Sequence, residues 1–224
     1  MRIAVIVPVL NEASEMPDLL AHLRVLKRQG CEIIIVDGGS DDGSDLIGRR
    51  EGFEVLSAPP GRAKQMNAGA RSAANEALLF LHADTRLPVN AVALVREVLE
   101  PGSRVWGRFD LEISGHSPML AVVAFFMNWR SRLSGIATGD QAIFVRKSAF
   151  EAVSGFADQP LMEDIALSLR LRAISPPACI PARAVTSGRR WERRGVWRTI
   201  FLMWRLRLAY WRGVSPETLA RLYR

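Results

Sequence analysis

Short apolar runs alternate with helical patterns along the first hundred residues of the chain. Continuous apolar runs of strand length occur at 3–7, 33–36, 55–56 and 77–81. Between and after them, apolar residues recur with the 3.6-residue period of an amphipathic helix over 17–29, 63–74 and 88–99. Gly30 ends the first of these helices and Pro88 begins the last. This alternation predicts an α/β fold with a mostly parallel central sheet and helices on both faces.

The pattern is looser in the second half of the chain. It predicts strands over 105–113 and 141–145, a short strand at Ile180, and helices over 120–133 and 162–172. No repeat or low-complexity linker interrupts it. We therefore predict one domain over 1–194, followed by a helical C-terminal extension over 195–224.

Polar residues follow three of the predicted strands. Asn11 and Glu12 come after the first strand, Asp37 ends the second, and Asp84 follows the fourth. The carboxyl ends of parallel strands meet at one edge of a sheet, and ligands bind in the crevice outside that edge. The sequence thus places an active site there.

The loop after the second strand is rich in Gly and Asp. Asp37 can accept hydrogen bonds from a base or ribose, and a glycine such as Gly39 lets the backbone approach a ligand. The alternative is an ordinary turn, in which Ser40 and Asp41 cap the next helix.

Two further groups carry candidate chemistry. The Asp84 carboxylate suits Mg²⁺ or Mn²⁺, which would bridge the two phosphates of a sugar nucleotide; alternatively Asp84 caps the helix at Pro88, and His82 alone is more typical of a packed histidine. Glu163 and Asp164 open an apolar helix. A carboxylate there suits a general base, although acidic residues also simply favour helix N-termini.

Taken together and in this order, the motifs resemble those of the family 2 glycosyltransferases. The resemblance runs through Val7–Glu12, Val36–Asp42, Leu81–Asp84, Gly139-Asp140-Gln141, Gly155-Phe156, Met162-Glu163-Asp164 and Arg189-Arg190-Trp191. With Gly213–Glu217, the chain resembles a bacterial subgroup, the radical-SAM/selenodomain-associated transferase 2 proteins, also called arsenosugar biosynthesis glycosyltransferases. The resemblance implies a GT-A, Rossmann-like fold and inverting transfer from a nucleoside-diphosphate sugar to an acceptor that the sequence does not identify.

The resemblance also implies residue roles. Asp164 would be the base and Asp84 the metal-binding carboxylate, and the donor would meet Pro8, Asn11, Glu12, Asp37, Gly39, Arg62, Asp84, Asp140, Arg190 and Trp191. His82 stands where the family's Asp-x-Asp pattern has its first Asp. As a second metal ligand, its imidazole would suit Mn²⁺ better than Mg²⁺.

Positive charge is concentrated in the C-terminal extension. The net charge is +7, whereas residues 189–224 alone carry ten Arg and two Glu, so the rest of the chain sums to −1. This local charge argues against a nucleic-acid binder and for a local anionic partner. Trp-Arg pairs recur at 197, 204 and 211, two helical turns apart, which fits a helix lying on an anionic membrane surface. Packing through these Trp residues onto the chain's own domain, or a homodimer interface, are the alternatives.

Other classes of protein have less support from the sequence. No run is long and apolar enough for a signal peptide or a bilayer span, so we expect a cytoplasmic protein, peripheral to the inner membrane face if the extension binds lipid. A sugar-nucleotide nucleotidyltransferase or a dinucleotide oxidoreductase would carry a Gly-rich loop after the first strand, where Asn11 and Glu12 stand. A nucleotide-binding or membrane-docking module without turnover remains an alternative.

Overall fold

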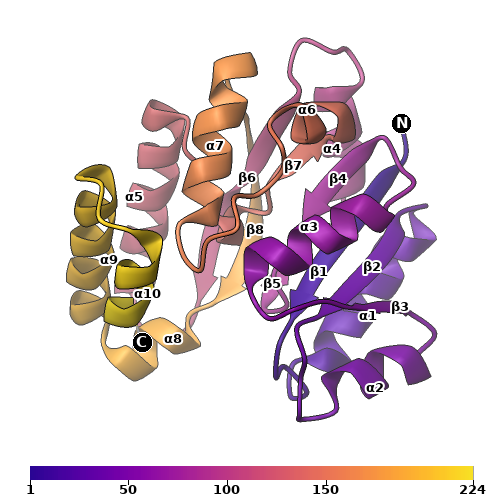
Figure 1. Ribbon diagram of the computed structural model, residues 1–224, viewed down its shortest axis with the longest axis horizontal. Coiled ribbons are helices and arrows are strands. Elements are labelled where there is room, and N and C mark those ends of the chain that lie inside the picture. Colours follow the sequence, from indigo (N-terminus) through magenta and orange to yellow (C-terminus); the bar gives the residue numbers. More distant parts are fainter. Residues whose placement is uncertain (224) are drawn as a thin grey trace.

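The computed structural model describes residues 1–223, except for the side chain of Arg190. Within this part of the chain, eight strands form one sheet in the order β3-β2-β1-β4-β7-β6-β8-β5, shown in Figure 1. The strands are β1 (Ile3–Val9), β2 (Glu32–Asp37), β3 (Glu54–Ser57), β4 (Ala77–Phe80), β5 (Thr85–Arg86), β6 (Trp106–Ser114), β7 (Phe144–Arg146) and β8 (Ala178–Ser187). The helices are α1 (Met16–Arg28), α2 (Ser44–Arg50), α3 (Arg62–Ser72), α4 (Ala91–Leu99), α5 (Met119–Ser134), α6 (Lys147–Ala152), α7 (Glu163–Ile174), α8 (Arg189–Arg194), α9 (Val196–Trp211) and α10 (Pro216–Tyr223), with a 3₁₀ turn, η1, at Gly139–Gln141.

The predicted mostly parallel sheet is confirmed. Strand β1 pairs in parallel with β2 and β4, and β2 pairs in parallel with β3. Strand β7 joins this half to β6 with antiparallel pairing on both sides, β6 and β8 are parallel, and β5 is an antiparallel edge. The carboxyl ends of β1, β2 and β4 therefore lie at one edge of the sheet.

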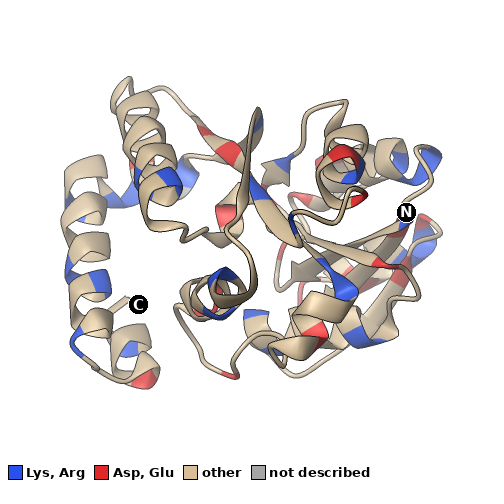
Figure 2. Ribbon diagram, turned by 90° about the horizontal axis from the view of Figure 1, so that it is seen from above, with Lys and Arg blue, Asp and Glu red and all other residues tan. Residues whose placement is uncertain are grey.

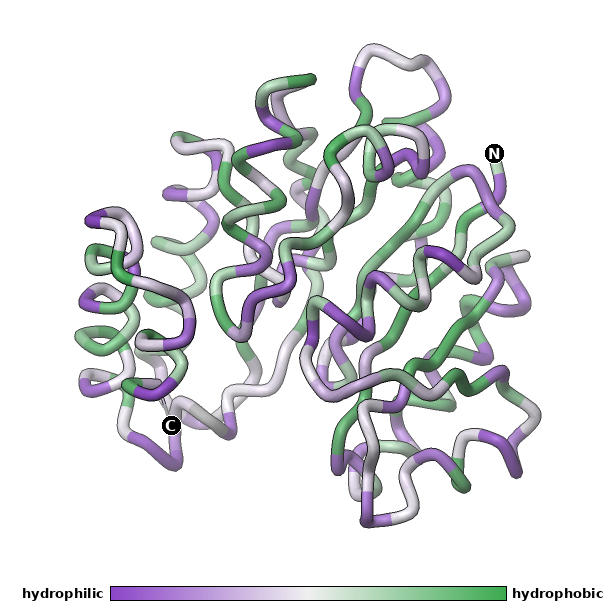
Figure 3. Tube along the Cα trace, in the orientation of Figure 1, coloured by the Kyte–Doolittle hydropathy of each residue, from purple (hydrophilic) through white to green (hydrophobic). Residues whose placement is uncertain are grey.

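Apolar side chains fill both faces of the sheet because successive residues of a strand point to opposite sides. Val5 and Val7 of β1 pack with α1 and α4 on one face, and Ala4 and Ile6 pack with α3, α6 and α7 on the other. Figure 3 shows hydrophobic residues running along the central strands. Burial on both faces explains why these strands appear in the sequence as unbroken apolar runs.

Strand β8 is longer than the short strand predicted at Ile180. It is ten residues long and pairs with β6 on both sides of a register shift between Phe109 and Asp110, whose partners are Ile180 and Arg183. Pro181 lies inside this irregularity. Because proline has no N–H to donate to a ladder, it is tolerated at a bulge, and in the sequence it looks like the end of the strand.

The C-terminal extension packs on the rest of the chain through its own apolar cluster. Leu206 of α9 and Leu219 of α10 are fully buried against Ile136, Met162 and Ile165. No helix in the described residues is long and apolar enough to cross a bilayer. The extension therefore brings α10 beside the first turn of α7, where the candidate base stands.

Candidate active site

The strand ends bring together charged groups from distant parts of the sequence. Burial raises the pKa of Glu12, and the nearby carboxylates of Asp84 and Glu15 raise it further, while Arg189 and Arg62 act in the opposite direction. Glu12 and Asp84, 72 positions apart in the sequence, thus lie within electrostatic range of each other. The predicted convergence of polar residues at this edge is confirmed.

The loop after β2 is tied firmly to the end of β1. The Asn11 N–H donates to Ser40 Oγ at 2.9 Å, and the Asp41 N–H donates to Asn11 Oδ1 at 3.0 Å. The Asp37 carboxylate accepts the Gly39 N–H at 2.8 Å and the Ser40 hydroxyl at 2.5 Å. Asp37 therefore shapes this turn. Its contact with a nucleotide stays a prediction.

Gly39 leaves an open surface on the same loop. Its φ of 91° lies in the region that favours glycine, and a Cβ built there would meet no atom within 4 Å. A ligand can thus approach the backbone at Gly39 closely, as the sequence predicts. Pro8 lies within β1 opposite Val36, so it positions the loop end and contributes little exposed surface.

Sequence reasoning missed Gln65 as a member of the site. Its buried amide donates to the carbonyl oxygens of Val9 and Val36, both at 2.8 Å. A Cβ at Gly38 would lie 2.9 Å from this amide, so Gly38 leaves it room. Gln65 clamps the ends of β1 and β2 together. The available signal was a polar residue on the buried face of the helix over 63–74.

The turn η1 joins the end of β4 to the start of α7. His82 Nδ1 lies 3.1 Å from Asp140 Oδ1, and the Gly139 N–H donates to Asp164 Oδ2 at 3.0 Å. The Ile165 N–H donates to the other Asp164 oxygen at 2.7 Å. A Cβ at Gly139 would lie 2.4 Å from His82 Nε2, so the imidazole packs directly on this glycine. His82, Asp140 and Asp164 form one connected group.

Burial dominates the electrostatics of the two acidic residues that open α7. It raises the pKa of Glu163, and the neighbouring Asp164 carboxylate raises it further, whereas the Arg62 guanidinium lowers it. Burial also raises the pKa of Asp164, against the two N–H groups that donate to its carboxylate. Both carboxyl groups hold their protons more tightly than exposed ones would.

Arg62 is the cation at the centre of these carboxylates. Burial among neighbouring atoms lowers the pKa of its guanidinium, but Glu163, Asp140 and Asp84 outweigh that effect, so the net pKa is raised. The side chain is nevertheless solvent-accessible. The structure therefore brings Arg62 together with the predicted carboxylates, and its contact with the donor stays a prediction.

A second cation, Arg130 of α5, was not found from the sequence. Its Nε and Nη2 atoms are buried without a hydrogen-bond partner in the described residues. Burial lowers its pKa, and the charge of Asp164 acts against that effect. Buried N–H donors without partners are rare in folded proteins. The only sequence signal is an arginine within an apolar helix.

The remaining residues predicted from the sequence lie in other surroundings. Trp191 packs against the apolar cluster of Leu111, Ile113 and Leu120, so its role in donor binding stays a prediction. The side chain of Arg190 lies outside the described residues.

The described residues contain no group of three His, Cys, Asp or Glu side chains that could hold a metal ion. Asp84 Oδ1 instead lies 3.4 Å from the hydroxyls of Thr85 and Thr186, and its binding of a metal ion stays a prediction.

Together, the mostly parallel sheet and the helices on both of its faces define an α/β, Rossmann-like fold of the GT-A type. The model of glycosyl transferase family 2 matches residues 4–151. The chain belongs to this family. A comparison with curated proteins finds no match.

Solved structures share the fold. A mannosyltransferase from Pyrobaculum calidifontis, in complex with GDP-Man and Mn²⁺, is 20% identical with a TM-score of 0.67, covering 93% of this chain and 61% of that chain. TarS 1–349 from S. aureus in complex with UDP-GlcNAc is 15% identical, with a TM-score of 0.65 over 84% and 58% of the two chains. Glucosyl-3-phosphoglycerate synthase from Mycobacterium tuberculosis, with Mn²⁺ and UDP, is 14% identical, with a TM-score of 0.61 over 83% and 71%. The chain thus spans about three fifths of the length of the first two of these solved chains.

Proposed function

We propose that the protein transfers a sugar from a nucleoside-diphosphate sugar to an acceptor hydroxyl with inversion at the anomeric carbon. The observation that carries this proposal is the convergence of Arg62, Asp84, Asp140 and Asp164 at the carboxyl ends of the parallel strands. Family membership supports it, as does the fold shared with proteins solved with GDP-Man and UDP-GlcNAc. The motifs at 139–141, 190–192 and 213–217 support the radical-SAM-associated subgroup.

Asp164 is the proposed general base. Each of its oxygens accepts one backbone N–H, which fixes the carboxylate and leaves one lone pair free on each oxygen. Its raised pKa makes it a stronger base than an exposed aspartate. The acceptor O–H gives its proton to Asp164 as the oxygen attacks the anomeric carbon, and the bond to the diphosphate breaks on the opposite side.

Asp84 and Arg62 are the proposed partners of the diphosphate. The Asp84 carboxylate would hold a Mg²⁺ or Mn²⁺ ion, and two of the solved structures that share the fold contain Mn²⁺. When bound, the cation supplies charge neutralisation for the leaving group. Arg62 adds a guanidinium on the same side.

His82 has two candidate roles at this site. Its Nδ1 is engaged by Asp140 and its Nε2 edge packs on Gly139. These contacts favour a positioning role, in which the imidazole orients Asp140 toward the donor. Direct metal ligation through His82 requires the ring to turn away from Gly139, and it stays a prediction.

The decisive experiment measures turnover of nucleotide sugars by an Asp164→Asn variant. With water as the acceptor, Mn²⁺-dependent hydrolysis of UDP- or GDP-sugars should fall at least about 100-fold, the usual effect of losing a general base. The dissociation constant for the nucleoside diphosphate should barely change, because the base acts on the acceptor. Asp158→Asn, at a position 72% exposed, is the matched control.

The outcome also separates the rival function. Hydrolysis near the wild-type rate in Asp164→Asn would remove the base assignment. Nucleotide binding by the wild type without hydrolysis of any sugar nucleotide would favour a binding module without turnover.

A further inference from the structure

Helix α9 exposes a stripe of large apolar side chains. Trp197, Trp204 and Trp211 are 61%, 70% and 78% exposed, and Phe201 and Leu208 between them are 64% and 53% exposed. At about 100° of rotation per residue, these five positions fall within an arc of about 80° on the helix. Exposed apolar residues that are contiguous, and not scattered singly, mark an interaction surface.

This stripe is not the surface by which α9 packs on its own domain. Leu206 and Thr199 are buried on the opposite side, and Leu202, Met203 and Tyr210 pack there with Met162 and Ile165. The expectation that the extension would pack on its domain through the Trp residues is therefore wrong. Helix α9 is apolar on two sides, and one of them has no partner within the described residues.

A second stripe lies on the neighbouring helix α5. Phe126 and Trp129 are 57% and 54% exposed there, and Val122, Phe125 and Leu133 are also exposed, while Val123 and Ala124 are buried on the opposite side. Figures 1 and 2 show α5 and α9 side by side. Val196 and Ile200 of α9 pack on the cluster that contains Val123, so the two helices share one apolar seam.

Cations border the stripe of α9. Arg198, Arg205 and Arg212 are exposed at a seven-residue spacing, next to the Trp stripe and on the side away from Val196 and Ile200. None of them forms an ion pair within the described part of the chain. Figure 2 shows blue, basic segments along this outermost helix, at the left of the view. Aromatic rings beside unpaired guanidinium groups are typical of a helix that lies in a membrane interface.

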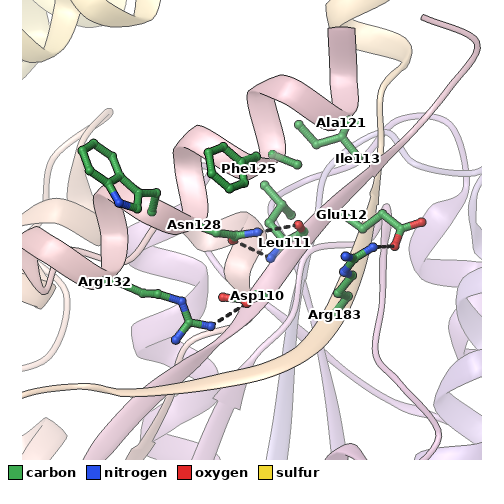
Figure 4. A pocket seen from close by; sticks show the side chains of 11 residues that line it. Asp110, Leu111, Glu112, Ile113, Ala121, Phe125, Asn128, Arg132 and Arg183 are labelled. Atoms are coloured by element: carbon green, nitrogen blue, oxygen red, sulfur yellow. Dashed lines mark hydrogen bonds and ion pairs between the residues drawn. The ribbon is translucent and has the colours of Figure 1, made fainter. Parts of the chain in front are cut away.

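A groove lies on the side of α5 that faces away from α9, and its arginines are paired with carboxylates. It has a volume of about 440 Å³ between α5 and β6, and Phe125 forms part of its wall (Figure 4). Its cations are already paired, Arg132 with Asp110 and Arg183 with Glu112. The cations of this groove are therefore neutralised by carboxylates, unlike Arg198, Arg205 and Arg212 of α9.

We propose that the exposed stripes of α5 and α9, with the three arginines, form one docking face for an anionic lipid bilayer. A second copy of the chain fits this face less well, because it would bring a second positively charged face against the first, and like charges repel. Residues 189–224 carry ten Arg against two Glu, which also favours an anionic partner. The helices would lie in the interface plane, with the aromatic rings in the lipid.

The docking face lies close to the candidate active site. The buried side of α9 contacts Met162 and Ile165, which flank Glu163 and Asp164. With helix axes about 8–10 Å apart, the lipid surface would stand roughly 15 Å from the proposed base. An acceptor hydroxyl held at the membrane surface would therefore be near the site. The docking proposal itself needs no transferase activity, so the two can fail independently.

The experiment is co-sedimentation of the full chain with vesicles of phosphatidylcholine and phosphatidylglycerol, and with phosphatidylcholine alone. We expect binding to the anionic vesicles that weakens with salt. Replacing Arg198, Arg205 and Arg212 with Gln should lower the partition coefficient about 100-fold, at about 1 kcal/mol per residue. The control replaces the exposed Arg28, Arg49 and Arg50 with Gln, which changes the net charge equally and should have little effect.

A second variant tests whether α5 belongs to the face. Replacing Phe126 and Trp129 with Ser should weaken binding about tenfold, at high salt as well as low, because the lost contribution is apolar burial. Leu46→Ser with Val89→Ser, both exposed elsewhere, is its control. Unchanged melting temperatures show that the variants fold.

Three results would overturn the proposal. Absence of the wild type from anionic vesicles at low salt excludes a membrane face. Equal losses of vesicle binding in the two arginine variants would show that binding depends only on the net charge of the chain. A dimer in sedimentation equilibrium that dissociates in the Phe126/Trp129 variant assigns the face to a second copy.

Discussion

At the scale of single residues, one backbone turn controls the chemistry of the site. Gly139 donates its N–H to Asp164 and supports the His82 ring, while its neighbour Asp140 accepts from that ring. A side chain at Gly139 would displace the imidazole, since its Cβ would lie 2.4 Å from two ring atoms. Asp140 and the proposed base Asp164 are therefore positioned together, although they are 24 positions apart in the sequence.

The paired carboxylates of α7 predict a specific pH dependence. Burial raises the pKa of Asp164, and only the ionised carboxylate accepts a proton, so activity should be lost as pH falls through this raised pKa. The Asp164 carboxylate raises the pKa of Glu163, and because a charge interaction is mutual we expect an ionised Glu163 to raise the pKa of Asp164 as well. Glu163→Gln should therefore move the acid limb of the kcat/KM profile to lower pH and keep activity at high pH.

Measuring kcat/KM from pH 4 to 9 for both proteins checks this prediction. An acid limb at the same pH in Glu163→Gln would show that the two carboxylates do not titrate as a pair. A limb at the ordinary aspartate value in the wild type would show that burial does not perturb the base.

The sequence predicts residues of the site where they stand at the ends of elements. Asp37, Asp84 and Asp164 were identifiable because each follows an apolar strand or opens a helix. Gln65 and Arg130 were not, because their roles depend on contacts with elements distant in the sequence. The periodicity of a helix indicates which face is buried, but not which backbone carbonyls or carboxylates lie opposite.

At the scale of elements, the apolar period located most strands and helices and failed where it is short or interrupted. The two-residue strand β5 and the six-residue helices α6 and α8 contain too few residues to show a period. Strand β8 looks broken at Pro181 because the bulge that accommodates proline is set by its pairing with β6. The helix α5 was predicted, but its exposed stripe was not, because its apolar residues surround most of the helix.

Helix α9 makes a sharp prediction about which side stabilises the fold. Leu206 is fully buried, so Leu206→Ala should lower the free energy of unfolding by about 2–5 kcal/mol through lost burial and a residual cavity. Trp204 is 70% exposed, so Trp204→Ala should change it by no more than about 0.5 kcal/mol. Urea denaturation of both variants measures the difference.

The opposite order, with Trp204→Ala the more damaging change, would mean that α9 packs through its tryptophans after all. The comparison needs no lipid, so it tests the packing of α9 separately from the docking of its outer side.

At the scale of the whole molecule, the two halves of the sheet carry different groups of the candidate active site. The parallel strands β3-β2-β1-β4 end at Asp37, Glu12 and Asp84, and α3 adds Arg62, so this half would receive the donor. The half formed by β7, β6 and β8 carries α7 with the proposed base, and α9 and α10 pack on it. The match of the family model to residues 4–151 covers the first half and also β6, η1 and β7, and it ends before α7 and β8. The proposed acceptor chemistry therefore rests on geometry more than the donor chemistry does.

Ligand-induced stabilisation tests the donor half as a unit. A nucleoside diphosphate that binds only the folded chain, at about 100 times its dissociation constant, stabilises it by about 2.7 kcal/mol. For a chain of 224 residues this corresponds to a rise in Tm of about 5–10 °C. With UDP or GDP the rise should be larger with Mn²⁺ than without, because Asp84 and the phosphates share the ion. Asp84→Asn should abolish that Mn²⁺-dependent part and leave the ligand-free Tm close to that of the wild type, whereas Asp158→Asn should leave both unchanged. If Asp84→Asn kept the full Mn²⁺-dependent rise, the ion would be held elsewhere, and Asp84 would only support the Thr85 and Thr186 hydroxyls that already lie beside it.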